Sequence, residues 1–443
     1  MSSPHDNSFG NIFKSTVMLG MARFATVIIG MVRIKAIAVL LGPTGIGLFG
    51  TLEIIITISV YVFGLGTASS GVREIALVRG GEDPHPLAIR IRTLRRLSLI
   101  LGTVGMLGLA ALAVPLSANS FGGVLSAQTI LILSPTILLT TLDCGLQANL
   151  KGLQRTRDLT ILTVMAALFS SFTTIIIVAQ SGSEGIVWAA VASSLVNLSL
   201  AAWFVRRLGG RPGKVTWTES WQASGNFIKL GISLTAALLL SAGVTYASRS
   251  IITAEISLAA VGIYLCAFSL SGKFVAFILD AMKLDFFPRL SSAYGQREEF
   301  NRIINDQTEV VLLLAIPGLF GTMTFAPQLI TVFYSEEFRE ATPLLVIFTM
   351  GCLWRVLGAP LGFVRVAAGR GSLYFWTEAL TNGIHLGLIV LFLSQYGLIG
   401  VAWAYFVHGL IQTGILVVIS HHISGFRWSL SIRRALVALL PMV

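Results

Sequence analysis

Long apolar runs separated by short polar stretches make up most of the chain, and each run is long enough to cross a bilayer as a helix. We expect twelve transmembrane spans. They lie near residues 12–39, 46–70, 94–115, 122–149, 158–180, 185–205, 226–248, 257–282, 308–330, 342–364, 374–394 and 397–420. The pattern predicts an all-α polytopic membrane protein.

The first run, Gly10 to Leu41, carries its polar residues on one helical face. They recur every three or four residues, the spacing of one face of a helix: Thr16, Gly20, Arg23, Thr26, Gly30 and Arg33. A cation as deep as Arg23 is costly in a bilayer unless it meets water, protein or an anion. Two interpretations follow. Arg23 pairs with a neighbouring acid and locks helices together, or this helix lines a polar cavity that receives an anionic ligand.

Similar polar stripes recur in spans of both halves, which favours a shared interior cavity. Its deep cations are Arg23, Lys273 and Arg355, and Arg33, Lys35 and Arg249 are expected at the outer mouth. We expect these six residues to bind substrate. Lys35 lies off the stripe and could instead extend to the membrane surface.

Four carboxylates are candidates for coupling a conformational change to an ion: Glu53, Asp143, Asp280 and Glu378. Glu53 and Asp143 could instead form ion pairs with Arg23 or Arg355, and Asp280 could neutralise Lys273. His385 is a further candidate beside Glu378, whereas His408 is expected to be a packing residue. No cofactor is expected, and a protonatable carboxylate would couple transport to H⁺ or Na⁺.

An internal repeat appears when the sequence is shifted by 215 residues: Gly10–Lys14 falls on Gly225–Lys229, Arg155 on Arg370 and Gly185 on Gly400. We expect a six-helix lobe at 1–205, a cytoplasmic linker at 206–224, a second six-helix lobe at 225–420 and a basic tail at 421–443. Because each lobe has an even number of spans, the pseudo-twofold axis should run along the membrane normal.

The positive net charge of the chain is explained by where its Lys and Arg residues lie. It has 55% hydrophobic residues, 12% charged residues and a net charge of +11, and 24 of its 31 Lys and Arg fall on one side of the predicted topology. This asymmetry places both termini in the cytoplasm and makes nucleic-acid binding unnecessary as an explanation. The N-terminus lacks signal-peptide features, so the first span should be retained. The three cysteines lie in apolar spans without disulfide or metal-site spacing, and no catalytic motif appears, so we expect no enzyme.

Four segments carry a resemblance to a known family: Leu41–Phe49, Phe287–Ser291, Phe333–Leu345 and Tyr396–Ala404. They resemble the polysaccharide or O-antigen flippase family, the Wzx-type branch of the multidrug/oligosaccharidyl-lipid/polysaccharide (MOP) exporter superfamily, over essentially the whole chain. Within it, the region from Lys229 to Glu299 is most similar to the flippase of the enterobacterial-common-antigen lipid-linked trisaccharide.

The resemblance implies a MATE-like fold of two lobes around a cationic cavity. It also implies alternating access that moves an undecaprenyl-diphosphate-linked oligosaccharide from the cytoplasmic to the periplasmic leaflet of the bacterial inner membrane. The first-helix arginine of such cavities maps onto Arg23. Such a protein is expected to act as a monomer, alongside other glycan-assembly membrane proteins.

Two other functions are alternatives to a flippase. A cation-coupled multidrug or small-molecule antiporter of the same fold needs an acidic or aromatic interior, which the deep basic residues oppose. A membrane glycan polymerase needs an extramembrane surface, which the short outer loops disfavour.

Overall fold

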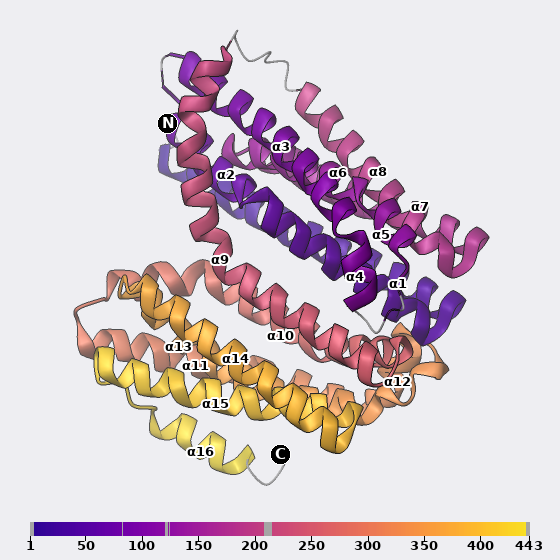
Figure 1. Cartoon of the computed structure of the whole chain (residues 1–443). Coiled ribbons are helices and arrows are strands. Elements are labelled where there is room, and N and C mark those ends of the chain that lie inside the picture. The colour runs from indigo at the N-terminus through magenta and orange to yellow at the C-terminus, as the bar shows by residue number, and fades with distance from the viewer. Residues whose placement is uncertain (1–3, 82, 120–122, 124, 208–214, 440–443) are drawn as a thin grey trace. The chain divides into compact units, whose positions relative to one another are not determined.

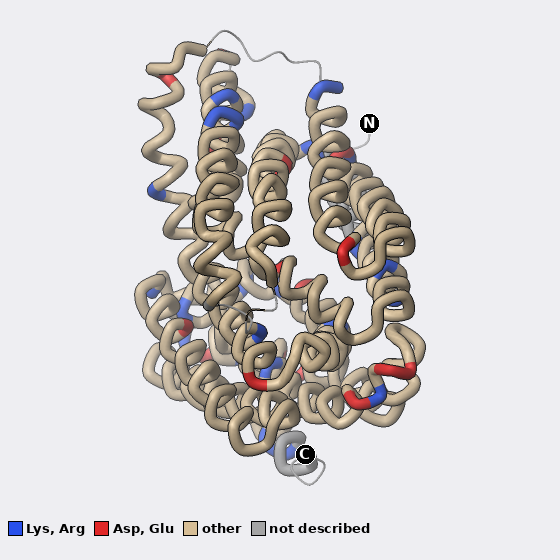
Figure 2. Tube along the Cα trace, turned by 45° about the vertical axis from the view of Figure 1, so that its right-hand side comes forward, with Lys and Arg blue, Asp and Glu red and all other residues tan. Residues whose placement is uncertain are grey.

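A computed structural model describes residues 4–81, 83–119, 123, 125–207 and 215–439, without the side chains of 4–19, 119, 284 and 435–439. Within these residues the backbone forms helices and turns and no strand. The expectation of an all-α protein is confirmed. Figure 2 shows that Lys, Arg, Asp and Glu occupy only small parts of the helical trace.

The chain divides into two compact units, which we call unit 1 (Met1–Tyr246) and unit 2 (Ala247–Val443). Figure 1 shows the helices in order along the chain. Unit 1 contains α1 (Pro4–Gly64), α2 (Thr67–Val78), α3 (His85–Ala111), α4 (Ala113–Asn119), α5 (Ala127–Leu133), α6 (Pro135–Gly152), α7 (Thr156–Ser181), the short η2 (Gly182–Glu184), α8 (Gly185–Arg207) and most of α9 (Trp217–Glu255).

Unit 2 contains the end of α9 and seven further α-helices. They are α10 (Leu258–Ser292), α11 (Arg297–Thr324), α12 (Ala326–Phe333), α13 (Ala341–Ala367), α14 (Gly371–Tyr396), α15 (Leu398–Ser424) and α16 (Leu430–Leu439), with the short η3 (Glu336–Phe338) before α13. Helix α13 is the centre of this unit, because it packs against α10, α11 and α15. Its apolar residues, such as Cys352, Val356 and Leu361, are fully buried.

The described residues contain ten helical segments long and apolar enough to cross a membrane. Two of them, Gly20–Gly64 with 45 residues and Thr156–Arg207 with 52, each exceed twice the roughly 20 residues that one crossing needs. The ten segments therefore accommodate the twelve predicted spans, and the protein is a multi-pass membrane protein. Its first two spans lie in α1, which bends at Gly42 (φ 61°).

The second span ends earlier than predicted. The expected span reached residue 70, but α1 stops at Gly64, and Leu65 and Gly66 have positive φ angles of 48° and 64° before α2 begins. Gly66 lies against the backbone of α9, since a Cβ atom on it would come within 2.3 Å of the Gly231 carbonyl oxygen. An apolar run continues through this break, so hydrophobicity alone did not reveal it.

The 215-residue repeat reappears in the backbone of both units. Gly182 and Gly397, which end α7 and α14, have nearly the same conformation, with φ and ψ of 60° and −142° against 60° and −146°. At equivalent sites the amide of Arg155 donates to the Leu150 carbonyl over 2.9 Å, and that of Arg370 to the Arg365 carbonyl over 3.0 Å. The duplicated sequences therefore fold into the same helix ends.

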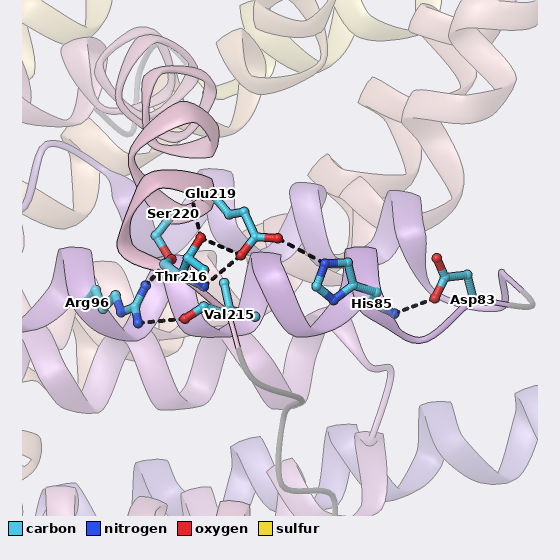
Figure 3. A network of polar contacts seen from close by, with 7 residues as sticks. All are labelled: Asp83, His85, Arg96, Val215, Thr216, Glu219 and Ser220. Carbon is cyan, nitrogen blue, oxygen red and sulfur yellow. Dashed lines mark hydrogen bonds and ion pairs between the residues drawn. The ribbon is translucent and has the colours of Figure 1, made fainter.

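The contact boundary lies further along the chain than the predicted linker at 206–224, much of which is outside the described residues. The reason is that the start of α9 is bound to α3 within unit 1. Figure 3 shows the Arg96 guanidinium donating to the carbonyls of Val215 (3.0 Å) and Thr216 (2.6 Å) and to the Ser220 hydroxyl (2.6 Å). His85 at the start of α3 contacts Glu219 over 3.0 Å. We call this set of contacts the α3–α9 clamp. The predicted lobe boundaries concern the duplication and stay a prediction.

Candidate functional site

Arg355 is an exposed cation on the most buried helix of unit 2. All residues of α13 from Leu344 to Arg365, apart from Arg355, are buried or half-buried. The sequence predicts this stretch as a membrane span, where an exposed arginine needs water or an anion. Arg355 is therefore accessible from a face of α13 that the rest of unit 2 leaves open.

Gly272 of α10 lies next to this arginine, and Lys273 follows it in the chain. A Cβ atom on Gly272 would be 3.8 Å from Nη1 of Arg355, so the guanidinium passes directly beside the residue that precedes Lys273. The Lys273 side chain is half-buried. We call Lys273 and Arg355 the unit 2 cation pair. The structure thus places the backbone of α10 at Gly272 beside Arg355, and the shared role of the two predicted cations stays a prediction.

The described residues place no carboxylate within the 4.0 Å of an ion pair to either member of the unit 2 cation pair. Asp280, the acid that could have neutralised Lys273, instead accepts from Lys283 Nζ at 2.9 Å. Positive charges within a predicted span that have no protein counter-ion are stabilised by a bound anion. This arrangement suits an anionic ligand.

Packing around Tyr405 of α15 holds the two helices that carry this pair. The Tyr405 ring meets Phe268 of α10 and Phe348 of α13 edge-on, with centroids 5.6 and 5.5 Å apart. Cys352 Sγ donates to the Ser271 carbonyl over 3.5 Å and lies 3.8 Å from the Tyr405 hydroxyl. The Tyr405 hydroxyl also interacts electrostatically with Arg355. The sequence analysis did not single out Tyr405, because its partners lie on other helices far away in the chain.

Glu378 of α14 is bound to Arg365, which lies one residue beyond the predicted span 342–364. Its carboxylate accepts from Arg365 Nη2 at 3.0 Å, and only 2% of the Arg365 side chain is exposed. The Arg365 guanidinium also lies 4.9 Å from the centre of the Tyr374 ring. Arg365 lies in the last turn of α13 and is buried. The predicted coupling role of Glu378 stays a prediction.

The predicted residues of unit 1 are spread over α1 and α6. All four predicted residues of α1 are described: Arg23 and Glu53 are exposed. Arg33 and Lys35, which lie between them on the same helix, are half-buried. The Arg33 guanidinium lies over the Phe49 ring, 5.3 Å from its centre, and is attracted by the charge of Glu53. The expected group at the outer mouth adds Arg249, a half-buried residue of unit 2. The common mouth therefore stays a prediction.

Asp143 of α6 is buried, and in the described residues the group bound to its carboxylate is an amide. Gln147 Nε2 donates to Asp143 Oδ2 at 2.9 Å, and Oδ1 is a buried atom with no hydrogen-bond partner in the described part of the chain. The two residues lie one turn apart on the same helix. The alternative role of Asp143, an ion pair with Arg23 or Arg355, stays a prediction.

Comparisons with known proteins place these features in a family. Residues 36–343 match the family described as polysaccharide biosynthesis protein. A relative in Haloferax volcanii, named as a probable low-salt glycan biosynthesis flippase, is 22% identical over 149 residues, or 33% of this chain. The chain spans about a third of that relative's length, since the match covers 31% of it.

Solved structures show the same fold. An inward-facing multidrug resistance MATE family transporter of the MOP superfamily superposes with a TM-score of 0.76 at 14% identity, covering 90% of this chain and 94% of its own. The lipid II flippase MurJ in an inward closed conformation superposes with a TM-score of 0.70 at 19% identity, covering 91% and 87%. The predicted MATE-like fold is confirmed. The closer similarity to the common-antigen flippase stays a prediction. With most of its length matched to one family, the chain belongs to the polysaccharide biosynthesis protein family and has the fold of the MOP superfamily.

Proposed function

We propose that this protein is a flippase that moves an undecaprenyl-diphosphate-linked oligosaccharide from the cytoplasmic to the periplasmic leaflet by alternating access. It acts in the bacterial inner membrane as a transporter without an enzymatic step, with both termini in the cytoplasm. The relative named as a glycan flippase and the MurJ fold support this class of cargo.

The unit 2 cation pair is the observation that carries the proposal. A diphosphate loses its hydration when it enters the membrane interior, and fixed cations replace that hydration with charge-assisted hydrogen bonds. Arg355 offers a planar fork that fits phosphate oxygens, and Lys273 adds a compact second charge. Neither has a carboxylate within ion-pair distance in the described residues, so both are available to the cargo.

The remaining predicted cations extend this proposal to the first helix. Arg23 would meet the cargo on α1, and Arg33, Lys35 and Arg249 would attract the anionic head group near the periplasmic surface. The same positive charges repel the cationic drugs that a multidrug antiporter carries. The proposal therefore differs in cargo from the MATE transporter that shares its fold.

The test is a translocation assay in proteoliposomes. An undecaprenyl-diphosphate-linked sugar with a fluorescent label is placed in one leaflet, and its appearance in the other is measured by chemical quenching. We expect transport by the unaltered protein, loss of at least tenfold in rate for Arg355→Ala and Lys273→Ala, and partial retention for Arg355→Lys, since each charge-assisted hydrogen bond contributes roughly 1.5–3 kcal/mol. Arg302→Ala is the matched control, because Arg302 is an exposed arginine of α11 paired with Glu299.

The outcome also separates the two classes of transporter. Translocation of a cationic dye, with no movement of the labelled lipid, would overturn the flippase proposal. Equal rates of lipid movement in the Arg355→Ala, Lys273→Ala and control proteins would overturn the role of the cation pair.

A further inference from the structure

Two histidines of unit 2 form a stacked pair inside the helical bundle. The rings of His385 on α14 and His408 on α15 are 4.4 Å apart between centroids and 22° from parallel. His408 Nε2 is a buried atom without a hydrogen-bond partner among the described residues, while the ring interacts with the backbone of Thr381. An unpartnered ring nitrogen is a costly feature in an apolar interior and is open to a proton.

The fold itself does not require imidazoles at this contact. The 215-residue repeat aligns His385 with Ser170 of α7 and His408 with Ser193 of α8. In unit 1 these two serines also meet, since the Ser193 hydroxyl lies 3.3 Å from the Ser170 carbonyl oxygen and 2.9 Å from the Thr174 hydroxyl. The same helix contact is thus made in unit 1 by groups that cannot titrate. The histidine pair is specific to unit 2, which also holds the unit 2 cation pair.

Two sets of polar groups lie near the histidine pair: Tyr405 with its contacts on α13, and the ion pair of Glu378 with Arg365. The Tyr405 ring lies 6.1 Å from that of His385, and the Tyr405 hydroxyl interacts with Arg355 and Cys352 of α13. Glu378 lies two turns from His385 on α14, and Arg365 already binds its carboxylate at 3.0 Å. No cluster of three or more His, Cys, Asp or Glu suitable for a metal occurs in the described part of the chain.

We propose that His385 and His408 together bind one proton, and that this proton is coupled through Tyr405 to the anion held by Arg355. The stack holds the face of the neutral ring against the protonated one, a favourable cation–π contact, whereas two positive rings at this distance would repel. The proton enters on an imidazole nitrogen, and no other bond changes.

The charges set the sign of the coupling. Without cargo, Arg355 and Lys273 repel a proton on the histidine pair. A diphosphate at Arg355 cancels this repulsion, so cargo and proton each favour binding of the other by the same factor. The role of the diphosphate rests on the proposed function, whereas the effect of Arg355 on the proton does not.

The test is a titration of the histidines by ¹⁵N nuclear magnetic resonance, on full-length protein in nanodiscs between pH 5 and 8. His385→Gln and His408→Gln assign the signals among the 6 histidines of the chain. Arg355→Gln should raise the proton affinity of the pair about tenfold, a shift of about one pH unit, because it removes the cation that interacts with the Tyr405 hydroxyl. Lys273→Gln should shift it in the same direction by less, and Arg355→Lys should leave it unchanged. Arg302→Gln is the control for loss of an arginine, and His422, an exposed histidine of α15, is the internal reference.

Undecaprenyl diphosphate added to the unaltered protein should have the same effect as Arg355→Gln. The inference is overturned if the pair stays neutral down to pH 5 in every variant, or if Arg355→Gln and Lys273→Gln titrate as the unaltered protein does. If these variants shift the titration and the lipid does not, the proton site is supported and the placement of the diphosphate at Arg355 is contradicted.

Discussion

Two arginines of α13 differ in burial and in pairing, and this difference suggests a structural role for one and a binding role for the other. Arg365 is buried and bound to Glu378, an arrangement that holds α13 against α14. Arg355 is exposed on the same helix and has no carboxylate within ion-pair distance in the described residues. A buried paired charge stabilises a specific packing, whereas an exposed unpaired one in a predicted span is available to a ligand.

We expect Arg365→Ala to destabilise the folded protein by roughly 3 kcal/mol, because it leaves the Glu378 carboxylate without its partner. The measurement is thermal unfolding of the detergent-solubilised protein. Adding Glu378→Ala should recover part of the loss, since the orphaned charge is then removed. Arg339→Ala, which breaks an exposed pair with Glu336, is the control and should change stability little. Equal losses for Arg365→Ala and Arg339→Ala would contradict this view of the pair.

Residue types and spacing predict Lys273 and Arg355 as deep cations, because a charge inside an apolar run can be recognised from the sequence alone. The partners of the nearby carboxylates could not be recognised in this way. Asp280 binds Lys283 on its own helix, and Glu378 binds Arg365, which lies one residue beyond a predicted span. The stacking of His385 on His408 joins two helices, so His408 was interpreted as a packing residue. Helical periodicity gives the face of each helix but not the helix that it faces.

At the scale of helices, apolar runs predicted the spans well, and the errors fall where the backbone turns without a polar residue. The break at Leu65 and Gly66 interrupts an apolar stretch, and only its left-handed backbone and the close approach of Gly231 reveal it. The start of α9 belongs to unit 1 because of contacts with α3 that lie more than a hundred residues away in sequence.

Gly66→Ala should destabilise unit 1 by roughly 2 kcal/mol. Its φ of 64° disfavours a side chain by about 1–2 kcal/mol, and the new Cβ would lie 2.3 Å from the Gly231 carbonyl oxygen. Gly225→Ala on α9, where nothing lies within 4 Å of a Cβ, should be neutral or stabilising by up to about 1 kcal/mol. Thermal unfolding of the two variants under the same conditions decides the point, and a stable Gly66→Ala protein would refute the assigned break.

Arg96→Ala should release the start of α9 from α3. It removes three hydrogen bonds and the contact with the Trp217 ring, whose centre is 4.3 Å from the guanidinium. Hydrogen exchange should become faster in residues 215–220 and remain unchanged in unit 2. Arg95→Ala removes the exposed neighbour and serves as control. Unchanged exchange in residues 215–220 of the Arg96→Ala protein would show that the α3–α9 clamp does not hold this segment.

At the scale of the whole molecule, the two duplicated units share a fold but differ in their charged residues. The two units repeat the same helix ends, as Gly182 and Gly397 show. The repeat nevertheless aligns Arg355 with Thr140 and Lys273 with Ile58, so unit 1 has no counterpart of the unit 2 cation pair. The duplication was visible in the sequence because the glycines and arginines at helix ends are kept. We interpret unit 2 as the half that holds the charge of the cargo.

The central claim is that the unit 2 cation pair binds the diphosphate of a lipid. The most direct measurement compares equilibrium binding of undecaprenyl diphosphate and of uncharged undecaprenol to the unaltered protein and to the Lys273→Ala/Arg355→Ala double variant. We expect the unaltered protein to prefer the diphosphate by at least a hundredfold, given two interactions of roughly 1.5–3 kcal/mol each, and the double variant to lose that preference while binding undecaprenol as before. An equal preference for the diphosphate in both proteins would contradict the account.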